Sequence, residues 1–530
     1  MTETEEDDSG HDPGHNPVGR DFIAPSLMAY RFFECEGAGL FIGDIVRIHD
    51  LVTGFTFFAK VTGLCHKKPG PCPATTNCSP DMGFGVEVEA FPLGFVDEAG
   101  SFQPPGVIPA PGSLVSRPRA ADLVFIREVM GDIEVGALKS GRGVLEDIPV
   151  AIPSEAVPQH IGIFGTTGMG KSNLMKVFAA SCMDIRKLGL LIVDPHGEYV
   201  LGHGKPGESL GLLNFTGGRD GLSVYSTRPA EERIRYGMEE LTLEHDDFRM
   251  SDLGLIFHLS DPLWEIIESL DPFSGDEIID FFVTEGVESL PSPYRITSQE
   301  SRYPHIVYAL RGASSGNLKA IQSRMSLLVR ETSLFLRRNG SSIPGILRDL
   351  MDNKVVLVDA PLMGESTELL LLSAITRSIM RTYQESAMSA VMGPEKKEYK
   401  VLIAIEEAQR ILSASGHKTH IFRECAIEGR KFGVGLGVIT QHPKNIDPSI
   451  LAQINTYIVL GLSDRNDRAM IASSAKQDLS WMDTEIQTLR RGDAVISTSR
   501  TVFPVSTRVH RFEHYIPYLE KKRKNVTPGN

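Results

Sequence analysis

The stretch GTTGMGKS, from Gly165 to Ser172, constrains the fold of this chain more than any other feature. It matches G-x-x-x-x-G-K-[ST], the pattern of a phosphate-binding loop. The apolar run HIGIF precedes it, and a helical stretch follows it. A strand, a glycine-rich turn and a helix in this order aim backbone N–H groups and a helix N-terminus at a phosphate. The stretch therefore predicts a nucleoside triphosphate site in an α/β domain.

Each part of this loop has an expected role in holding ATP. The Lys171 ammonium can reach the β- and γ-phosphates and act in catalysis, and the Ser172 hydroxyl can bind Mg²⁺. The expected cofactors are therefore ATP and Mg²⁺. The predicted ATP-binding residues are Gly165, Thr166, Thr167, Gly168, Met169, Gly170, Lys171, Ser172 and Asn173.

Three apolar runs end in acidic residues: LLIVD at Asp194, VVLVD at Asp359, and VLIAIEE at Glu406 and Glu407. Only the third run offers adjacent carboxylates, and hydrolysis needs one group for the metal ion and one for the attacking water. We assign Glu406 to the magnesium ion, through a water molecule, and Glu407 to activation of the water. The alternative is that both acids only open a helix, where Glu is favoured. Asp359 is interpreted as a structural or accessory acid.

Two candidates follow later in the chain. The run GVGLGVIT ends at Gln441, whose amide could sense the γ-phosphate or orient water. The segment EGRKFG supplies Arg430, which we predict to be an arginine finger, because charge that develops on a transferred phosphoryl group needs a cation. An ordinary surface arginine is the alternative, and Arg423, Arg465 and Arg468 stay open as fingers.

The segment IVDPHGEYV follows the strand expected beside the phosphate loop. Asp194, His196 and Glu198 would lie on the loop that leaves this strand, where groups that line the site are expected. A polar turn without a function is the alternative.

The pattern along the chain predicts an α/β fold with additional parts. An acidic start with almost no apolar residues is typical of a disordered tail. Short apolar runs broken by Gly and Pro then favour a small β-barrel or sandwich, and apolar runs that alternate with helical stretches favour a mostly parallel sheet. The expected parts are a tail (1–20), an N-terminal β-barrel (21–150), an ATPase core (151–219 and 350–505), a helical insertion (220–349) and a C-terminal arm (506–530).

Composition limits the location and the partners of the chain. No apolar run approaches the roughly 20 residues that cross a bilayer, and the acidic start lacks the apolar core of a signal peptide, so we expect a cytoplasmic protein without a membrane partner. The net charge of -14 argues against a protein that coats nucleic acid, although a ring can still gather basic side chains in its channel.

Six cysteines are too few and too scattered for a disulfide framework. Cys65, His66, Cys72 and Cys78 could together bind zinc, but their spacings match no standard site. A loose loop of the barrel is the favoured interpretation.

Four segments together resemble the HerA family of hexameric DNA-translocating ATPases, which are relatives of FtsK among the RecA-like P-loop motors. They are HIGIFGTTGMGKSN, IVDPHGEY, VLIAIEEAQR and the run from Glu428 to Leu462. The second and fourth segments are the specific ones. The resemblance implies a RecA-like core with a helical insertion, an N-terminal barrel and a C-terminal arm that braces a neighbouring subunit.

The resemblance also implies a homohexamer that encircles double-stranded DNA and pumps it with ATP. The implied partner is a nuclease of the NurA type in DNA end resection and repair, or another effector in an anti-phage defence complex, docked on the barrel. Lys171 and Ser172 would be the phosphate-loop pair, and Arg430 would act in trans. Asp194 and His196 would line the site.

Two positions depart from the family pattern, which more often shows Asp-Glu at Glu406-Glu407 and often His at Gln409. Glu can still bind magnesium through water, so we expect slower or retuned hydrolysis at worst. Two other functions stay open: a membrane-associated pump like FtsK or VirB4, and a scaffold in which ATP only holds the ring together. Stimulation of hydrolysis by duplex DNA would separate a motor from a scaffold.

Overall fold

The computed structural model describes residues 16–67, 85–202, 209–286, 301–361, 363–392, 398–413 and 420–526. The chain divides into two compact units, each built from segments that are distant in the sequence. The first unit contains Met1–Met130, Gly136–Val150 and Gln477–Val509, and the second contains Gly131–Val135, Ala151–Lys476 and His510–Asn530.

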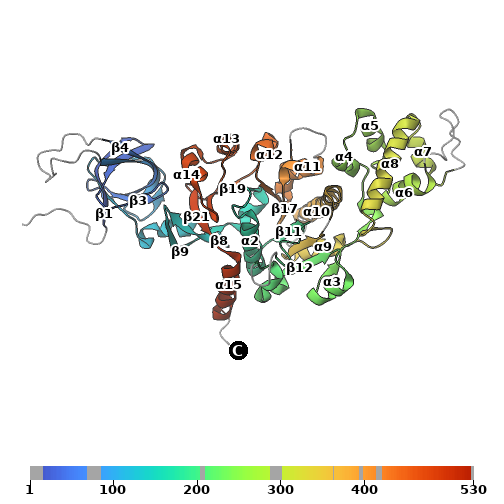
Figure 1. Ribbon diagram of the computed structural model, residues 1–530, viewed down its shortest axis with the longest axis horizontal. Helices are drawn as coiled ribbons and strands as arrows, with labels where there is room; N and C mark the ends of the chain where they lie inside the picture. Colours follow the sequence, from blue (N-terminus) through green and yellow to red (C-terminus); the bar gives the residue numbers. More distant parts are fainter. Residues whose placement is uncertain are drawn as a thin grey trace, which may run out of the picture. The chain divides into compact units, whose positions relative to one another are not determined.

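A closed barrel of six antiparallel strands forms the main part of the first unit (Figure 1). The strands follow the order β2-β1-β7-β3-β4-β5, and β5 pairs back onto β2. Alternate apolar side chains fill the interior, as a half-buried strand requires. The predicted β-barrel is confirmed. Its strands are β1 (Pro17–Ser26), β2 (Ala29–Glu34), β3 (Ile45–His49), β4 (Thr56–Lys67), β5 (Gly85–Val96) and β7 (Leu114–Ser116), with the short β6 (Phe102–Gln103) paired to β5.

The first strand begins earlier than expected. β1 starts at Pro17, inside the segment predicted as a tail, and Val18 and Phe22 are buried in the barrel. Gly19, Arg20 and Asp21 separate Val18 from Phe22 in the sequence, and Asp21 has a φ of 53°, so the apolar alternation is interrupted. Residues 1–15 lie outside the described residues.

The first unit also contains a second antiparallel group of strands in the order β20-β21-β8-β9. Helix α14 (Asp483–Thr488) belongs to the same unit. The predicted core segment 350–505 therefore differs from the structure at its end, because residues 477–509 return to the barrel unit through long-range pairing. The strands are β8 (Ile133–Ser140), β9 (Gly143–Ile152), β20 (Asp493–Ser497) and β21 (Val505–Val509).

The second unit is built on a parallel sheet in the order β13-β12-β16-β11-β17-β18-β10-β19 (Figure 1). Its central strands are buried along their whole length, which is typical of a parallel sheet with both faces covered. The predicted RecA-like α/β core is confirmed. The strands are β10 (Ile161–Phe164), β11 (Gly189–Asp194), β12 (Leu222–Ser226), β13 (Glu239–Glu240), β16 (Val355–Asp359), β17 (Val401–Ile405), β18 (Val434–Thr440) and β19 (Thr456–Leu460).

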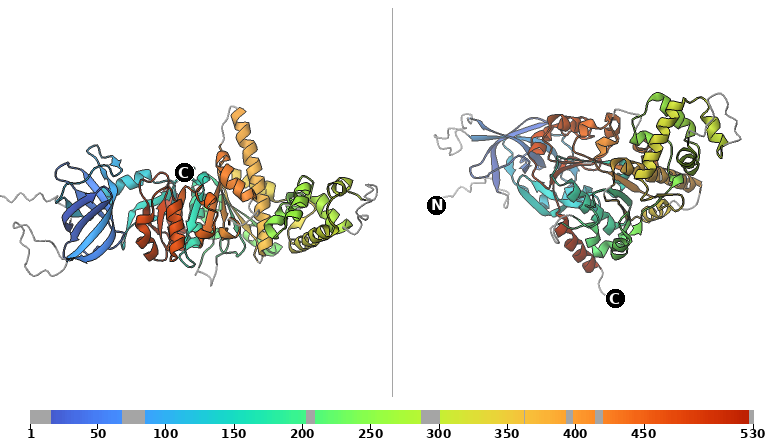
Figure 2. Two further views of the ribbon diagram at one scale, coloured as in Figure 1. Left: turned by 90° about the horizontal axis from the view of Figure 1, so that it is seen from above. Right: turned by 45° about the vertical axis from the view of Figure 1, so that its right-hand side comes forward.

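The helical insertion is shorter than the predicted range 220–349. Its helices gather in a cluster of their own beside α10 (Glu365–Met392) (Figure 2). At its ends, β12 pairs with β16 and α9 (Ile343–Met351) packs on β11 and β16, so both belong to the core. The run LSVYS, which forms β12, mixes apolar and polar residues and is too short for a strand to be recognised in the sequence. The insertion contains α4 (Asp252–Ile256), α5 (Asp261–Leu270), α6 (Gly275–Ile279), α7 (Pro304–Ala309), α8 (Ser315–Glu331) and the small parallel pair β14 (Leu243–Glu244) and β15 (Leu336–Arg337).

The C-terminal arm is the helix α15 (Phe512–Val526), which packs against α2 (Lys171–Ile185) of its own chain. The Tyr515 and Ser181 hydroxyls lie 2.8 Å apart across this contact. Bracing of a neighbouring subunit by the arm stays a prediction. Within the described residues, none of the helices combines the length and the apolar composition that a bilayer crossing requires.

Candidate functional site

The phosphate loop connects β10 to α2 at the carboxyl edge of the parallel sheet. Gly168 and Gly170 have φ angles of 81° and 108°, which non-glycine residues rarely adopt. These two glycines let the loop reverse its direction, so that backbone N–H groups can surround an anion in front of the N-terminus of α2. The predicted order of strand, loop and helix is present.

Lys171 lies over this loop. Its ammonium donates a hydrogen bond to the Gly165 carbonyl at 2.8 Å. Burial lowers the pKa of Lys171, and the nearby carboxylates of Glu407 and Glu406 act in the opposite direction. The ammonium and the acidic pair are therefore near enough to interact electrostatically.

Glu406 follows the last residue of β17. Its Oε1 accepts a hydrogen bond from the Tyr199 hydroxyl. Some of its surface still reaches solvent, yet the close enclosure by protein raises the pKa of Glu406 to about 7, while the Tyr199 hydrogen bond and Lys171 oppose that rise. The carboxylate is therefore enclosed but has one oxygen available for a ligand.

Glu407 has a left-handed backbone, with φ of 46° and ψ of 43°. Such conformations are uncommon outside glycine and gather at functional sites. Its Oε2 accepts a hydrogen bond from Gln409 Nε2 at 2.6 Å, and Gln441 Nε2 lies 3.4 Å from both oxygens. The Thr440 hydroxyl in turn donates to Gln409 Oε1 at 2.5 Å. The side-chain amides of Gln409 and Gln441 thus hold the Glu407 carboxylate near the end of β18.

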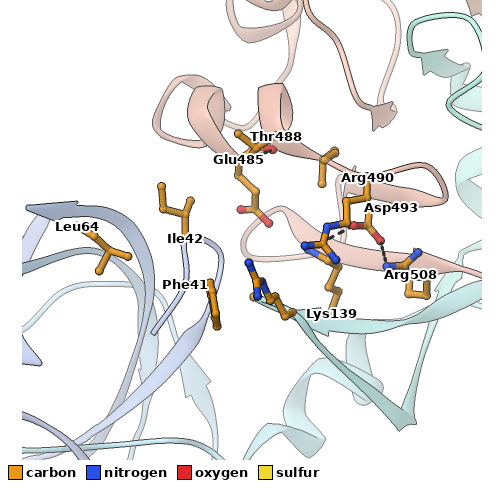
Figure 3. Close-up of a pocket in the computed structure, with 12 residues that line it drawn as sticks. Phe41, Ile42, Leu64, Lys139, Glu485, Thr488, Arg490, Asp493 and Arg508 are labelled. Atoms are coloured by element: carbon orange, nitrogen blue, oxygen red, sulfur yellow. Dashed lines mark hydrogen bonds and ion pairs between the residues drawn. The ribbon is translucent and has the colours of Figure 1, made fainter. Parts of the chain in front are cut away.

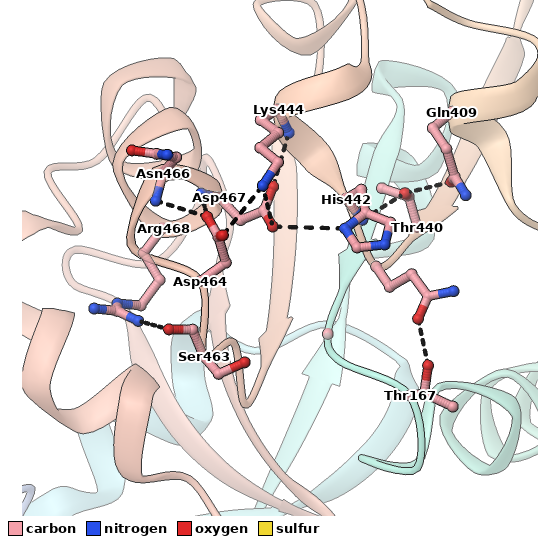
Figure 4. A network of polar contacts seen from close by, with 12 residues as sticks. Thr167, Gln409, Thr440, His442, Lys444, Ser463, Asp464, Asn466, Asp467 and Arg468 are labelled. Carbon is pink, nitrogen blue, oxygen red and sulfur yellow. Dashed lines mark hydrogen bonds and ion pairs between the residues drawn. The ribbon is translucent and has the colours of Figure 1, made fainter.

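Gln441 connects the acidic pair to the phosphate loop. Its side-chain oxygen accepts a hydrogen bond from the Thr167 hydroxyl (Figure 4). The structure therefore brings Lys171, Glu406, Glu407 and Gln441 to one edge of the sheet.

A second group of polar contacts lies beside this edge and is structural (Figure 4). Asp464 caps α13 (Arg465–Ser474) by accepting from two backbone N–H groups, and Lys444 pairs with Asp464 at 3.1 Å. The Arg468 guanidinium donates to the carbonyls of Leu462 and Ser463 at 3.0 and 2.8 Å. These contacts favour a structural role for Arg468 over that of a finger.

Asp194 uses its carboxylate within its own turn. Its two oxygens accept hydrogen bonds from the backbone N–H groups of Glu198 at 3.0 Å and Tyr199 at 2.8 Å, and burial raises its pKa. His196 is exposed on this turn and, with Arg410, opposes the rise that burial causes in the pKa of Glu368. The predicted site-lining role of Asp194 is therefore indirect: its carboxylate orders the turn.

Asp359, at the end of the neighbouring strand, is fully buried. Arg228 binds both of its oxygens, at 2.7 and 3.2 Å, and the Ser226 hydroxyl donates to one of them at 2.5 Å. These contacts fit the predicted structural role.

Arg430 lies on the opposite edge of the sheet. It is exposed on the 3-10 turn Gly429–Phe432, which precedes β18, and it acts electrostatically on His160, which precedes β10. A strand of seven residues separates the two edges by roughly 20 Å. Arg430 therefore cannot reach Lys171 of its own chain. Arg423 pairs with Asp447 at 2.5 Å.

The Asn173 side chain is engaged by the C-terminal arm, and ATP binding by Asn173 stays a prediction. Its side-chain amide donates to the His510 carbonyl at 2.8 Å and accepts from the Phe512 N–H at 3.0 Å. The side chain fastens the C-terminal arm to α2, because it points across the helix toward residues 510–512.

A model of the central domain of helicase HerA matches residues 133–379 of the chain. The DNA double-strand break repair helicase HerA of Pyrococcus furiosus is 24% identical over 408 residues, which cover 72% of this chain and 70% of that relative. The protein of the same name from Sulfurisphaera tokodaii is 25% identical over 385 residues, or 71% and 70% of the two chains. These matches make the chain similar to helicase HerA over most of its length.

The HerA central-domain match includes the phosphate loop and the turn from Asp194 to Tyr199, and it ends before the acidic pair. Among solved structures, the bacterial conjugative coupling protein TrwB superposes with a TM-score of 0.44 at 14% identity, covering 73% of this chain and 92% of that chain. VirB4 of Thermoanaerobacter pseudethanolicus gives 0.39 at 12% identity, covering 72% and 96%.

The oxygen donors of this candidate site suit magnesium, which prefers carboxylate, hydroxyl and water oxygens. Ser172 is the second residue of α2, and Glu406 interacts electrostatically with Lys171. Within the described residues, no three or more His, Cys, Asp or Glu side chains form a metal-binding group. Cys65 and His66 end β4, whereas Cys72 and Cys78 of the predicted zinc alternative lie outside the described residues.

Proposed function

We propose that this chain is a member of the HerA family, an ATP-driven translocase of double-stranded DNA that works as a homohexameric ring. The observation that carries the proposal is the convergence of Lys171, Glu406, Glu407 and Gln441 at the end of the phosphate loop. A cation, two carboxylates and an amide are the groups that hydrolysis of a phosphoanhydride requires.

In the proposed reaction Lys171 exchanges the Gly165 carbonyl for the β- and γ-phosphates of ATP. Ser172 would hold the magnesium ion directly and Glu406 would hold it through a water molecule, and the ion would neutralise charge on these phosphates. Glu407 accepts a proton from the attacking water, and Gln441 orients that water. For this step the Glu407 carboxylate must be released from Gln409, whose Nε2 donates to it at 2.6 Å.

Arg430 supplies the arginine finger to the neighbouring subunit in this proposal. Its place on the opposite edge of its own sheet supports a role in trans. A mixture of Arg430→Ala and Glu407→Gln subunits forms some sites that have both residues intact, so partial recovery of hydrolysis is expected. Two inactive proteins that stay inactive when mixed would contradict the trans role.

DNA as the cargo is supported by the printed names of the two relatives, which are DNA double-strand break repair helicases. With a net charge of -14, the outer surface should repel DNA. The proposed contacts are therefore Lys and Arg side chains in the channel of the ring, and binding should weaken as salt increases.

The barrel has an exposed apolar end that could dock the partner. Met28 in the β1–β2 turn, Val52 in the β3–β4 turn and Ile108 in the loop before β7 are 57%, 80% and 46% exposed. The Gly112 N–H donates to the Phe22 carbonyl at 2.9 Å, and this contact brings the third loop beside the first strand. Grouped apolar side chains on a surface mark interaction sites.

We propose that this end binds a NurA-like nuclease or another effector. The double substitution Met28→Asp, Val52→Asp should abolish pull-down of the partner and leave ATP hydrolysis intact. Undiminished pull-down would place the partner elsewhere on the chain.

The proposed function is tested by ATP hydrolysis with and without linear duplex DNA, at low and at moderate salt, with Lys171→Ala as the inactive control. Stimulation of several-fold that fades as salt rises is expected. Hydrolysis that does not respond to DNA contradicts the translocase. It would favour the scaffold. The scaffold is the second candidate because two amides hold Glu407.

A further inference from the structure

Tyr199 is a buried residue that contacts the candidate site and has no assigned role. Its side chain is 3% exposed, and its hydroxyl donates to Glu406 Oε1. A tyrosine hydroxyl in the interior needs a polar partner, and here the partner is one of the two adjacent carboxylates at the end of β17.

The place of Tyr199 is fixed by Asp194, the last residue of β11. Asp194 is 1% exposed, and its two oxygens accept the N–H groups of Glu198 and Tyr199. Gly197 has a φ of 69°, which lets the chain turn tightly between Asp194 and Glu198. One buried carboxylate thus closes the turn from residue 194 to residue 199 and sets the direction in which Tyr199 leaves it.

The sheet brings this turn beside the acidic pair. β11 and β17 are neighbouring parallel strands, with Ile192 opposite Ala404. Two residues further along each strand, Asp194 and Glu406 leave the sheet at the same edge. A Glu side chain has three rotatable bonds, and ordering them on binding costs conformational entropy. A hydrogen-bond donor in a fixed position beside one carboxylate oxygen removes much of this freedom before the metal ion binds.

We propose that Tyr199 is the positioning residue of Glu406, and that Asp194 acts on the magnesium site only by holding Tyr199 in place. The inference rests on the proposed function, because it assigns Glu406 to the metal ion. It gives the segment DPHGEY a physical role: a side chain without contact to nucleotide orients the carboxylate that binds the ion. Partners of this kind typically change metal affinity or activity by about 10- to 100-fold.

Tyr199→Phe tests the proposal, because it removes the hydroxyl and keeps the buried ring. The matched control is Tyr225→Phe on β12, which loses a hydroxyl donating to a carboxylate remote from the site, Asp349 Oδ2 at 2.9 Å. Two quantities are measured: the Mg²⁺ concentration that gives half-maximal ATP hydrolysis, and the affinity for fluorescent methylanthraniloyl-ADP with Mg²⁺ and with EDTA.

For Tyr199→Phe the half-saturating Mg²⁺ concentration should rise about 10-fold, and excess Mg²⁺ should restore most of the maximal rate. Binding of the fluorescent ADP should weaken in Mg²⁺ and stay unchanged in EDTA. Asp194→Asn, which loses one acceptor of the turn, should show the same signature, whereas Tyr225→Phe should match the wild type.

A wild-type Mg²⁺ dependence in Tyr199→Phe would overturn the proposal. Equal loss of binding in Mg²⁺ and in EDTA would also overturn it, since a general disturbance of the fold would then explain the result. If the wild-type protein itself shows no Mg²⁺-dependent hydrolysis, the proposed function fails first, and that outcome is distinct from both.

Discussion

The two units of the molecule both bury charged side chains, but they treat them differently. In the first unit Lys60 and Glu485 form an ion pair at 2.9 Å with side chains 2% and 8% exposed, and the Ser506 hydroxyl hydrogen-bonds to both. In the second unit Lys171 binds only a backbone carbonyl, and Glu406 binds only a tyrosine hydroxyl, among the described residues.

The difference separates a structural cluster from a binding site. The lysine and the glutamate of the first cluster bind one another and the same hydroxyl, although burial still lowers the pKa of Lys60 against the attraction of Glu485. The charges beside the phosphate loop keep unsatisfied bonding capacity while burial disfavours their ionised forms, which lowers the pKa of Lys171 and raises that of Glu406. A ligand with phosphate oxygens and a cation would satisfy both groups at once.

The strongest test of the charged cluster beside the phosphate loop is Glu407→Gln. It should lower the rate of ATP hydrolysis by about 10²- to 10⁴-fold, the usual contribution of a general base. ATP should still bind, because Lys171 and the loop are intact. Filter binding of radiolabelled ATP together with phosphate release would measure both effects. If Glu406→Gln instead gives the variant that binds without hydrolysis, the roles of the two acids are exchanged.

A substitution in the Lys60–Glu485 cluster of the first unit should instead change the stability of the protein. Lys60→Met leaves Glu485 buried without its cation, which typically costs about 3–5 kcal/mol of unfolding free energy. Trp481 stacks on Phe91 in the same unit at 4.3 Å, so its fluorescence, in a Trp264→Phe background, reports urea unfolding of that unit.

The matched double variant Lys60→Met, Glu485→Leu should recover most of the lost stability, since it buries no unpaired charge. Both variants should hydrolyse ATP normally in the absence of urea. A loss of hydrolysis equal to that of Glu407→Gln would show that the two clusters are not separate in function.

A smaller effect is expected at His160, which lies buried at the edge of the sheet opposite the phosphate loop. Its Nδ1 accepts the Leu436 N–H at 2.9 Å, and burial lowers the pKa of His160 to about 4. The unfolded chain, with an ordinary pKa near 6.5, binds this proton first as the pH falls. Stability is therefore full above pH 6.5 and decreases down to pH 4.

Between pH 7.5 and pH 5 this single group should lower the unfolding free energy by about 2 kcal/mol. His160→Asn offers an acceptor for the same N–H and does not titrate, so it is the control. Urea midpoints of the two proteins at both pH values measure the difference. An identical pH dependence in both would show that His160 is not a buried neutral group.

Features encoded in short contiguous stretches could be predicted from the sequence. The phosphate loop needs a strand, two glycines in left-handed conformations and a helix start, and all of these are adjacent in the chain. The acidic pair and Gln441 were found because parallel strands end at one edge, so a polar residue after an apolar run falls near the loop.

Features made by distant segments could not be predicted. The return of residues 477–509 to the barrel unit depends on pairing of β21 with β8, more than 350 residues apart in the chain. Asn173 directly follows the phosphate-loop motif in the sequence, and only the position of residues 510–512 shows that its amide is occupied. Tyr199 stood in a recognised segment, but an aromatic residue after a turn gives no sign that its hydroxyl meets a glutamate from another strand.

The most direct test of the ATP-hydrolysis site is a structure of the protein with Mg²⁺, ADP and aluminium fluoride, an analogue of the transferred phosphoryl group. The Lys171 ammonium should have left the Gly165 carbonyl for the fluoride and β-phosphate, Glu406 should hold a water of the magnesium ion, and Glu407 should contact the attacking water. A nucleotide bound with Lys171 still on Gly165, and with Glu407 still held by Gln409, would contradict the assignment of the site.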